Sequence, residues 1–505
     1  MRPERQSAPC IATRLGPASF PHPVGQLQLR ETAISWLVLT GTYVYKIKKP
    51  LHLDYLDAST LERRRFLCEE ELRLNRRFAP ALYLAVVPIG EVGAEPVIDA
   101  PGPAIEYAVR MRQFAASEEL AQCLADNAVA SAQMSMLGTR LGQWHEAPPE
   151  AREASWGSFE LISSQVLGNF PAPGADAAGS GPALTRLAAW THAQLTALQP
   201  LIEARRREGR VRECHGDLHA GNVVRWQGEW LPFDCLEFEP RLRWIDVISD
   251  VAFLFMDLLA HERADLAFAF LSAWLERSGD YGGMALLRFY AVYRALVRAK
   301  VDALAGEQQR QTWRIATAGR LAHGRSAALI LMHGVSASGK SWLSTQLIAA
   351  LAAVRVRSDV ERRRLCGSGA HSHAADDVTY RRLYACAEQA LAAGVPVIVD
   401  ATFLLAGRRE PYVQLARSAA CPLLIIDCQA PVKVLEERIV ERHREAKDPS
   451  EADLDVLHRQ LATAEPLRAQ SGICVIRAST DAPDALAGVV QQARAQLARQ
   501  GGRST

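Results

Sequence analysis

The sequence lacks the features of a secreted, zinc-binding or membrane-spanning protein. Its ten cysteines are scattered, without a C-x-x-C pair or a Cys/His cluster at zinc spacing, which is typical of reduced thiols in the cytoplasm. Residues 1–20 contain no apolar core of a secretory signal. No uninterrupted apolar run reaches the length of a transmembrane helix, and the stretch 250–260 has only the length of a buried helix. We therefore predict a cytoplasmic protein with no membrane partner.

The sequence also has little net charge. Its 58 Lys and Arg residues are balanced by 56 Asp and Glu residues, which leaves a formal net charge of +2. This balance argues against a protein that coats nucleic acid or a membrane surface. Hydrophobic residues make up 49% of the chain, so a soluble globular protein is expected.

The length of 505 residues is too great for one ordinary hydrophobic core, so more than one domain is expected. The stretch 319–328, rich in Gly, Ala and basic residues, indicates a boundary. We predict a loose N-terminus over residues 1–24, a first domain over 25–322 and a second domain over 326–500.

The first domain divides into a strand-rich part and a helical part. Residues 34–50 are rich in β-branched and aromatic residues and predict a hairpin that turns at Gly41. Residues 59–79 begin with Ser and Thr and continue with helical apolar spacing. We expect a small antiparallel sheet with one helix over 25–112, followed by a mainly helical part over 113–322.

The second domain alternates between strands and helices. The apolar stretches "ALILMHG", "VRVRSD", "VPVIVDATF" and "PLLIIDC" are each followed by a helical pattern. Such alternation predicts a parallel sheet covered by helices. No internal repeat is visible, so the two domains are expected to have different folds.

A first group of chemically active side chains is predicted around the stretch "ECHGDLHAGNVV", residues 213–224. The run "NVVRWQGEWLPFD" has apolar residues on both sides of Gly228, so folding it there brings Asn222 and Asp234 to the same end of a hairpin. Asp217 precedes Asn222 by five positions, the separation of base and metal-binding Asn in the kinase pattern H-R-D-x-x-x-x-N. Phosphoryl transfer requires such a base and hard oxygen ligands for Mg²⁺.

A lysine and a glutamate upstream complete the pattern. Lys46 and Lys48 share one face of a predicted strand, and the following helix carries Glu70 and Glu71. In kinase-like folds a strand lysine paired with a helix glutamate positions the nucleotide phosphates. We prefer Lys46 and Glu71 for these roles, while the sequence leaves Lys48 and Glu70 open.

These motifs resemble the catalytic core of the aminoglycoside phosphotransferase (APH) and choline-kinase-like family, a branch of the protein-kinase fold. The resemblance rests on "CHGDLHAGNVV" and "PFDCLEF" and covers roughly residues 25–320. It implies that Asp217 is the catalytic base, that Asn222 and Asp234 bind Mg²⁺, and that Lys46 binds phosphate. The sequence departs from the kinase pattern in lacking a G-x-G-x-x-G loop before Lys46.

A second, independent phosphate site is predicted at "GVSASGKS", residues 334–341, which is a complete G-x-x-x-x-G-K-S motif between a strand and a helix. The backbone amides of the loop and the positive helix end would bind phosphate oxygens. Lys340 would bridge the β- and γ-phosphates, and Ser341 would coordinate Mg²⁺. The predicted nucleotide-binding residues of this loop are Gly334, Ser336, Ala337, Ser338, Gly339, Lys340 and Ser341.

Further candidates lie at the ends of the next strands. Asp400 ends the strand in "VPVIVDATF", where a carboxylate would lie near Mg²⁺. Asp359 follows the strand in "VRVRSD" and is the candidate base for a substrate hydroxyl, with Arg357 and Arg362 as candidate substrate ligands. Ligands and catalytic groups gather at the carboxyl ends of strands in such sheets.

A basic helix completes the second set. Arg438 and Arg442 lie one helical turn apart and could act on ATP phosphates from a lid, although a solvated charged helix is an equal alternative. The segment 326–500 resembles P-loop kinases of the AAA_33, gluconate-kinase, zeta-toxin and polynucleotide-kinase type. By that resemblance Asp359 is the base and either Arg438 or Arg442 is a lid arginine.

Together the two sets predict an ATP- and Mg²⁺-dependent kinase with two nucleotide sites and small-molecule hydroxyl substrates. The order of the domains resembles bacterial bifunctional fusions of a phosphotransferase and an ATP-binding protein. One alternative is that only one domain catalyses and the other is a regulatory nucleotide-binding module. Another is an aminoglycoside resistance kinase, although the sequence shows no acidic cluster for a polycationic drug. Polynucleotide ends stay open as substrates of the P-loop domain.

Overall fold

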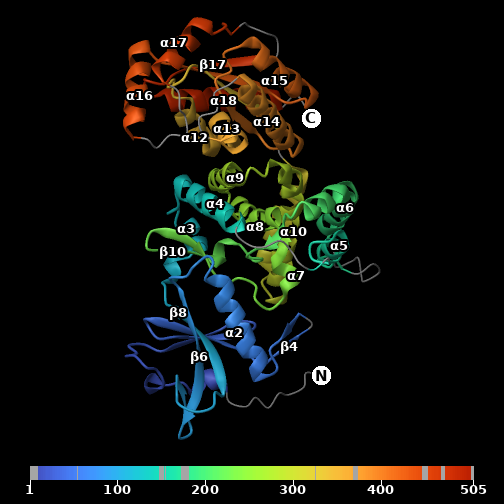
Figure 1. Cartoon of the computed structure of the whole chain (residues 1–505). Coiled ribbons are helices and arrows are strands. Elements are labelled where there is room, and N and C mark those ends of the chain that lie inside the picture. Colours follow the sequence, from blue (N-terminus) through green and yellow to red (C-terminus); the bar gives the residue numbers. More distant parts are fainter. Residues whose placement is uncertain are drawn as a thin grey trace. The chain divides into compact units, whose positions relative to one another are not determined.

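The computed structural model describes residues 10–501 except 54, 147–152, 154, 172–180, 325, 368–372, 446–452 and 468–472. Figure 1 shows the helices and strands of the chain, coloured along the sequence. The chain forms two compact units, each assembled from three segments. Unit 1 comprises Met1–Ala128, Ala147–Ser158 and Ala204–Asp250. Unit 2 comprises Val129–Glu146, Phe159–Glu203 and Val251–Thr505.

Unit 1 is built on a six-stranded antiparallel sheet with the strand order β1-β2-β3-β8-β6-β7. The predicted hairpin at Gly41 is present, and Gly41 has a φ of 91°, a left-handed conformation that glycine adopts without strain. The strands of this sheet are β1 (Gln28–Glu31), β2 (Ser35–Leu39), β3 (Tyr43–Lys48), β6 (Tyr83–Val92), β7 (Glu95–Ile98) and β8 (Glu106–Arg112).

The predicted helix is α2 (Leu61–Asn75), which packs against β6 and β8. It begins after Thr60, whose hydroxyl accepts a hydrogen bond from the backbone N–H of Arg63 at 3.3 Å. Leu67 and Leu74 are buried, as is the charged residue Glu71. The helix therefore brings a carboxylate to the sheet together with its apolar side chains.

The start of the described chain is packed rather than loose. Residues 10–24 form α1 (Ile11–Arg14) and the short helix η1 (Pro17–Ser19). Leu15 and Phe20 are buried in a core cluster with residues of the sheet such as Tyr45. The expectation of a loose N-terminus is therefore corrected for residues 10–24, because their apolar side chains cover the sheet; residues 1–9 lie outside the described residues.

The predicted hairpin after "GDLHAGN" is formed by β10 (Val223–Trp226) and β11 (Glu229–Pro232). The two-residue turn consists of Gln227 and Gly228, with φ values of 51° and 84°. Positive φ at both positions is the signature of a type I′ turn, whose twist matches that of a two-stranded hairpin. The neighbouring pair β9 (Val211–Glu213) and β12 (Trp244–Asp246) positions the loop that leads into it.

Smaller elements complete unit 1. They are β4 (His52–Leu53), β5 (Leu56–Asp57), η2 (Ala116–Glu118), α3 (Leu120–Ala125), η3 (Ala220–Asn222) and α7 (Pro240–Arg243). Two helices, α6 (Pro182–Arg207) and α8 (Val247–Ala260), have residues in both units.

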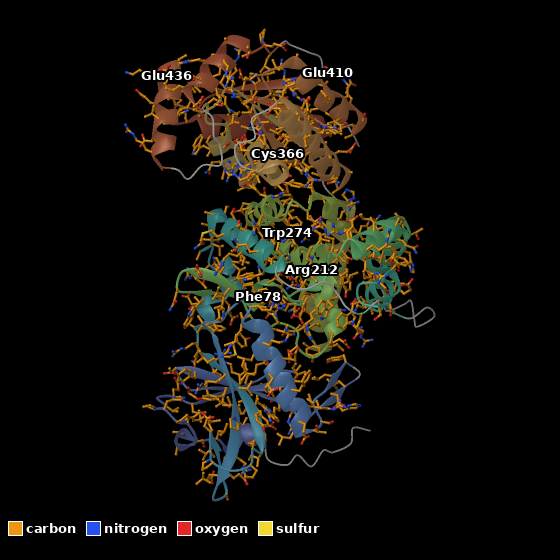
Figure 2. All side chains as sticks on the ribbon, viewed as in Figure 1. Phe78, Arg212, Trp274, Cys366, Glu410 and Glu436 are labelled. Atoms are coloured by element: carbon orange, nitrogen blue, oxygen red, sulfur yellow. The ribbon has the colours of Figure 1, made fainter. Side chains whose placement is uncertain are left out.

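The helical part of unit 2 contains the tightly packed pair α4 (Ser131–Glu146) and α9 (Ala264–Ser278). A Cβ on Gly138 would lie 2.2 Å from the carbonyl oxygen of Phe270, so only glycine permits this approach. Trp274, which is labelled in Figure 2, lies on α9 and is fully buried. The other elements here are α5 (Phe159–Leu167), η4 (Tyr281–Gly283), α10 (Met284–Leu304) and α11 (Gln308–His323).

The predicted parallel sheet is present in unit 2, with five strands in the order β14-β15-β13-β16-β17. Its strands are β13 (Leu329–His333), β14 (Val354–Arg357), β15 (Val397–Asp400), β16 (Leu423–Gln429) and β17 (Ile473–Ser479). The accompanying helices are α12 (Lys340–Leu351), α13 (Ser358–Cys366), α14 (His373–Ala392), α15 (Ala406–Ser418), α16 (Val432–Glu445), α17 (Leu454–Thr463) and α18 (Ala485–Gly501).

Within the described residues, no helix combines the length and the apolar character that a membrane crossing requires. All ten cysteines are described, and each is a free thiol.

Candidate functional site

The candidate site of unit 1 is organised around the buried Glu71, whose carboxylate contacts two lysines. Lys46 and Lys48 lie two positions apart on β3, so their side chains share one face of the sheet. The Nζ of Lys46 lies 2.8 Å from Oε1 of Glu71, in the geometry of an ion pair rather than of a directed hydrogen bond. Lys48 donates to the other oxygen of Glu71.

The second partner of each lysine separates their roles. Lys48 also donates to the buried Glu237 and is itself only 2% exposed. Lys46 donates to Asp234, whose side chain is 43% exposed. The chain thus encloses Lys48 between two carboxylates, while Lys46 faces a carboxylate that solvent reaches. Glu70, the other candidate partner in the sequence, contacts Arg73 and Arg243 instead.

The pKa shifts follow from this burial. Burial alone would raise the pKa of Glu71, but the charges of Lys46 and Lys48 outweigh it and lower the pKa to about 2. Burial raises the pKa of Glu237; Lys48 opposes this effect, and the charge of Glu71 adds to it. The pKa of Lys46 lies well above its ordinary value, because Asp234 and Glu71 outweigh the effect of its burial. Glu71 and Lys46 are therefore both charged at neutral pH.

Asp234 is held in an uncommon backbone conformation at the end of the hairpin. Its φ is 62°, a region that costs energy for a residue with a Cβ. Its backbone N–H donates to the hydroxyl of the buried Tyr83 at 3.1 Å, and the next N–H, that of Cys235, donates to Asn75 at 3.0 Å. The side chains of Tyr83 and Asn75 therefore hold the backbone at Asp234 in place.

Asp217 and Asn222 meet in the preceding loop. The Nδ2 of Asn222 donates to the backbone oxygen of Asp217 at 3.0 Å and to its carboxylate at 3.1 Å. This orientation leaves the Oδ1 of Asn222 as the acceptor end of the amide. The backbone oxygen of Asn222 accepts a hydrogen bond from the N–H of Phe233 at 2.9 Å, which ties it to the residue before Asp234. The structure thus brings all three predicted residues to one end of the hairpin.

His219 lies beside Asp217, with its Nε2 3.5 Å from the carboxylate oxygen. Its Nδ1 accepts a hydrogen bond from the N–H of Gly221 at 3.0 Å. Because Nδ1 is an acceptor, the proton of a neutral His219 is on Nε2, the atom that faces Asp217.

His215 and Asp250 brace this loop. The backbone N–H groups of His215 and Gly216 donate to the two oxygens of Asp250, at 3.1 and 2.9 Å. The ring of His215 donates from Nε2 to the backbone oxygen of Phe233 at 2.8 Å, and burial lowers its pKa, so the ring is neutral. Both residues therefore hold the loop and the hairpin together.

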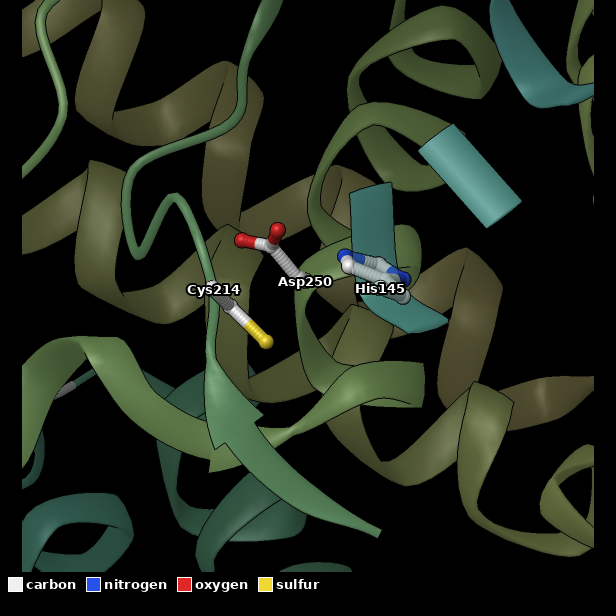
Figure 3. A group of neighbouring side chains, drawn as sticks. All are labelled: His145, Cys214 and Asp250. Carbon is white, nitrogen blue, oxygen red and sulfur yellow. The ribbon is translucent and has the colours of Figure 1, made fainter. Parts of the chain in front are cut away.

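Figure 3 shows the Asp250 carboxylate beside the loop that continues from Cys214. His145, which is drawn there too, belongs to unit 2. In that unit its Nδ1 accepts a hydrogen bond from the indole of Trp274 at 3.1 Å. The hydrogen bonds of Asp250 and of His145 are those of structural residues.

The candidate site of unit 2 is formed by residues 334–341, between β13 and α12. Lys340 donates to the backbone oxygen of Val335 at 2.6 Å and contacts the hydroxyl of Ser338 at 3.4 Å. A Cβ on Gly334, which has a φ of 135°, would lie 2.5 Å from the oxygen of Cys428. The loop thus requires glycine where the backbone leaves β13.

A side chain from α17 contacts one of the loop amides. The N–H of Ser336 donates to the amide oxygen of Gln460 at 2.7 Å. Backbone N–H groups of this loop are the donors that bind phosphate oxygens in P-loop proteins. In this structure the side chain of Gln460 thus occupies one of the N–H donors of the loop.

The strand ends bring the predicted carboxylates to a cavity of about 660 Å³ beside the loop. Asp400 is buried, accepts a hydrogen bond from Ser344 at 2.9 Å and lies 3.9 Å from the Nε of Arg357. Asp359 and Arg362 line the cavity, and Arg362 forms an ion pair with Asp376 at 3.1 Å. The cavity is also lined by Lys340, Ser341, Asp400 and Arg438.

Arg438 holds the P-loop rather than extending from a lid. Its guanidinium donates to the backbone oxygen of Ala337 at 3.2 Å and to the hydroxyl and backbone oxygen of Thr480, each at 3.0 Å. It still lines the cavity, so contact with a nucleotide stays a prediction. Arg442 lies on α16, but its side chain lies outside the described residues.

Several residues of these sites are missed by sequence reasoning. Glu237 is one, although an acidic residue in the apolar run "PFDCLEF" is a signal for it. Ser344, Gln460 and Thr480 are ordinary polar residues of helices and loops, and no local pattern indicates their contacts with the site.

The fold and the two clusters distinguish a unit with an antiparallel sheet and a lysine–glutamate–aspartate cluster from a parallel-sheet part with a P-loop. Residues 329–467 match a family model described as an AAA domain (AAA_33). The chain is 30% identical over 480 residues to uncharacterized protein Rv2004c of Mycobacterium tuberculosis and, to the same extent, to uncharacterized protein Mb2027c of Mycobacterium bovis. The alignments cover 88% of this chain and 94% of each relative. The chain therefore belongs to the family of these mycobacterial proteins.

Solved structures resemble the two parts separately. A gluconokinase from Sinorhizobium meliloti covers 35% of this chain and 94% of its own, with 27% identity and a TM-score of 0.26. A choline kinase from Cryptosporidium parvum covers 59% of this chain and 88% of its own, with 8% identity and a TM-score of 0.37. The GDP and kanamycin complex of an APH(2″) enzyme covers 60% of this chain and 94% of its own, with 11% identity and a TM-score of 0.36.

Proposed function

We propose that the protein is an ATP- and Mg²⁺-dependent phosphotransferase with two nucleotide sites, each of which transfers the γ-phosphate to a hydroxyl group of a small molecule. The proposal is carried by one observation: each unit has its own lysine, carboxylates and hydrogen-bond donors at one place. Lys46 with Glu71 and Asp234 forms one set, and the loop 334–341 with Asp400 forms the other. Neither set needs a residue of the other.

In unit 1, Lys46 would bind the nucleotide phosphates and Asp217 would orient and deprotonate the acceptor hydroxyl. Asn222 and Asp234 fit a hard divalent cation, because one offers an amide oxygen and the other a half-exposed carboxylate. Bound there, Mg²⁺ would neutralise charge on the transferring phosphoryl group. The backbone strain of Asp234 supports this role, since such strain is concentrated at functional sites.

In unit 2, the amides of the loop and Lys340 would bind the phosphates, and Asp359 would act on the acceptor hydroxyl from the cavity wall. Ser341 and Asp400 fit a divalent cation in the same way, as a hydroxyl and a buried carboxylate beside the loop. Arg362 would bind an acceptor group in this cavity. Arg357 would act indirectly, because it lies against Asp400.

The test measures ADP release by the full-length protein against a library of hydroxyl-bearing metabolites and aminoglycosides. Asp217→Asn should reduce turnover of unit 1 substrates at least about 100-fold, within the range for loss of a general base. Lys340→Met should remove turnover by unit 2. Matched controls are Asp126→Asn and Lys433→Met, which change exposed residues.

The outcomes separate the alternatives. If only one of the two variants removes turnover, one unit is a nucleotide-binding module and the two-site enzyme is wrong. If aminoglycosides alone support Asp217-dependent turnover, the protein is a resistance kinase. If neither variant changes any turnover, the proposal of a phosphotransferase fails.

A further inference from the structure

Helix α9 borders the edge strand of the parallel sheet in unit 2. The backbone N–H of Arg355, on the edge strand β14, donates to the hydroxyl of Ser272 on α9 at 3.0 Å. The guanidinium of Arg364 donates to the backbone oxygen of Glu276 at 2.6 Å. Helix α9 ends at residue 278, more than fifty residues before the P-loop begins at 334, and it is hydrogen-bonded to β14 and α13. The neighbour of β14 in the sheet is β15, the strand that carries Asp400.

Glu276, near the end of α9, contacts two arginines of strand β14, one with each carboxylate oxygen. Its Oε2 lies 2.9 Å from Arg355, and its Oε1 lies 3.3 Å from Arg357. All three side chains are mostly buried. Each oxygen therefore fixes a different guanidinium.

Arg355 extends this contact to the helix after the P-loop. Its guanidinium donates to the hydroxyl of Thr345 at 2.7 Å, to the hydroxyl of Ser344 at 3.1 Å and to the backbone oxygen of Ser341 at 3.3 Å. Ser341 is the residue whose hydroxyl the motif assigns to Mg²⁺. Arg355 thus positions the first turn of α12 through these three hydrogen bonds.

The contacts close into a ring at Asp400. Ser344 donates to Asp400 at 2.9 Å, and the Nε of Arg357 lies 3.9 Å from the same carboxylate oxygen. From Glu276 the ring runs through Arg355, Ser344, Asp400 and Arg357 and returns to Glu276. The two candidate cation ligands, Ser341 and Asp400, are both held by this ring.

We propose that Glu276 is a positioning residue for the Mg²⁺–nucleotide site of unit 2, an inference that rests on the proposed function of that site. Glu276 draws Arg357 away from Asp400 and so keeps the carboxylate available to the cation. Without its charge, Arg357 is attracted more strongly to Asp400 and competes with Mg²⁺. Removal of the negative charge of Glu276 also lowers the electrostatic attraction of the site for Mg²⁺, so both effects weaken cation binding.

The test measures ATP binding by calorimetry in full-length protein that also carries Lys46→Met, so that unit 2 alone binds. In Glu276→Gln the Mg²⁺ concentration needed for half of the maximal ATP affinity should rise about tenfold, as expected when an outer partner of a metal ligand is lost. ATP affinity in EDTA should stay unchanged or become tighter, because one negative charge is removed. A merely structural defect would weaken binding under both conditions.

Two further variants keep the inference falsifiable. Glu146→Gln removes the ion pair that Glu146 of α4 forms with Arg277, the neighbour of Glu276 on α9. This variant should leave the Mg²⁺ requirement unchanged. Adding Arg357→Gln to Glu276→Gln removes the competing guanidinium and should restore the Mg²⁺ requirement to within about twofold of its original value. An unchanged Mg²⁺ requirement in Glu276→Gln, or no restoration in the double variant, would overturn the role of Glu276.

The proposed function has its own control. Lys340→Met in the same background should abolish ATP binding. If it does not, the P-loop is not the nucleotide site and the proposed function of unit 2 fails. If it does, and Glu276→Gln leaves the Mg²⁺ requirement unchanged, only the role of Glu276 is wrong.

Discussion

Replacing Lys48 by methionine should destabilise unit 1, although Lys48 has no proposed role in catalysis. Lys48 is enclosed by Glu71 and Glu237, and all three side chains are almost fully buried. Methionine fills a similar volume but leaves Glu237 without the ammonium group that neutralises it. Glu71 keeps its contact with Lys46. The cost is therefore that of one buried carboxylate that has lost its partner.

The expected loss of stability follows from the one carboxylate, Glu237, that is left without its ion-pair partner. Removing one member of a buried ion pair typically costs about 3–5 kcal/mol. For a unit of this size each kcal/mol corresponds to roughly 2–4 °C, so the Tm of unit 1 should fall by roughly 6–20 °C. Protonation of Glu237, whose pKa is already raised by burial, would keep the loss near the lower end.

Lys46→Met is the matched control, because the two lysines lie on the same strand face and both contact Glu71. Its second partner, Asp234, is exposed enough to be hydrated after the substitution. The expected cost is only about 1–2 kcal/mol, while nucleotide binding by unit 1 should be lost. The two substitutions should therefore separate stability from function.

Differential scanning calorimetry of the full-length variants measures the first effect, and ATP titration in the Lys340→Met background measures the second. The transition of unit 1 should move in Lys48→Met, and the transition of unit 2 should not. If Lys46→Met lowers Tm as much as Lys48→Met does, the assignment of the two lysines is wrong.

Three further predictions concern the same groups of residues. Gln460→Ala should tighten ATP binding by unit 2 about fivefold, the equivalent of one hydrogen bond, because the Ser336 N–H is released; unchanged or weaker binding in calorimetry would contradict this. The pKa of Glu71 is about 2 when folded and 4.5 ordinarily, so its contribution to stability is present above pH 4.5 and is lost as the pH falls toward 2. Urea titrations should show this slope, and Glu71→Gln should flatten it. Gly334→Ala places a Cβ 2.5 Å from the Cys428 oxygen and should abolish ATP binding by unit 2 while a transition for unit 1 persists.

The local parts of both sites could be predicted from the sequence. The hairpin from Asn222 to Asp234 is specified by alternating apolar residues around Gly228, and its strands pair as expected. The P-loop is contiguous in the chain, so its spacing carries the whole motif. In both cases neighbours along the chain determine the geometry.

The parts that depend on distant residues could not be predicted. Lys46 and Lys48 look equivalent on one strand, and they differ only through Asp234 and Glu237, which lie far along the chain. Arg357 looks like a substrate ligand at the end of a strand, but its guanidinium lies between the carboxylates of Glu276 and Asp400 and closer to that of Glu276. Such roles are set by tertiary packing, which a one-dimensional pattern does not contain.

The contact between α9 and the edge strand β14 limits where the chain can be cut into fragments that keep their structure. A fragment cut at the predicted boundary near residue 326 would keep the P-loop and its motif but lose Ser272 and Glu276. The N–H of Arg355 would then face solvent on an uncovered strand, the kind of edge that pairs with other chains. The parts of the chain before and after residue 326 are thus not independent modules, because the strand β14 of the later part is bound by a helix that lies before the cut.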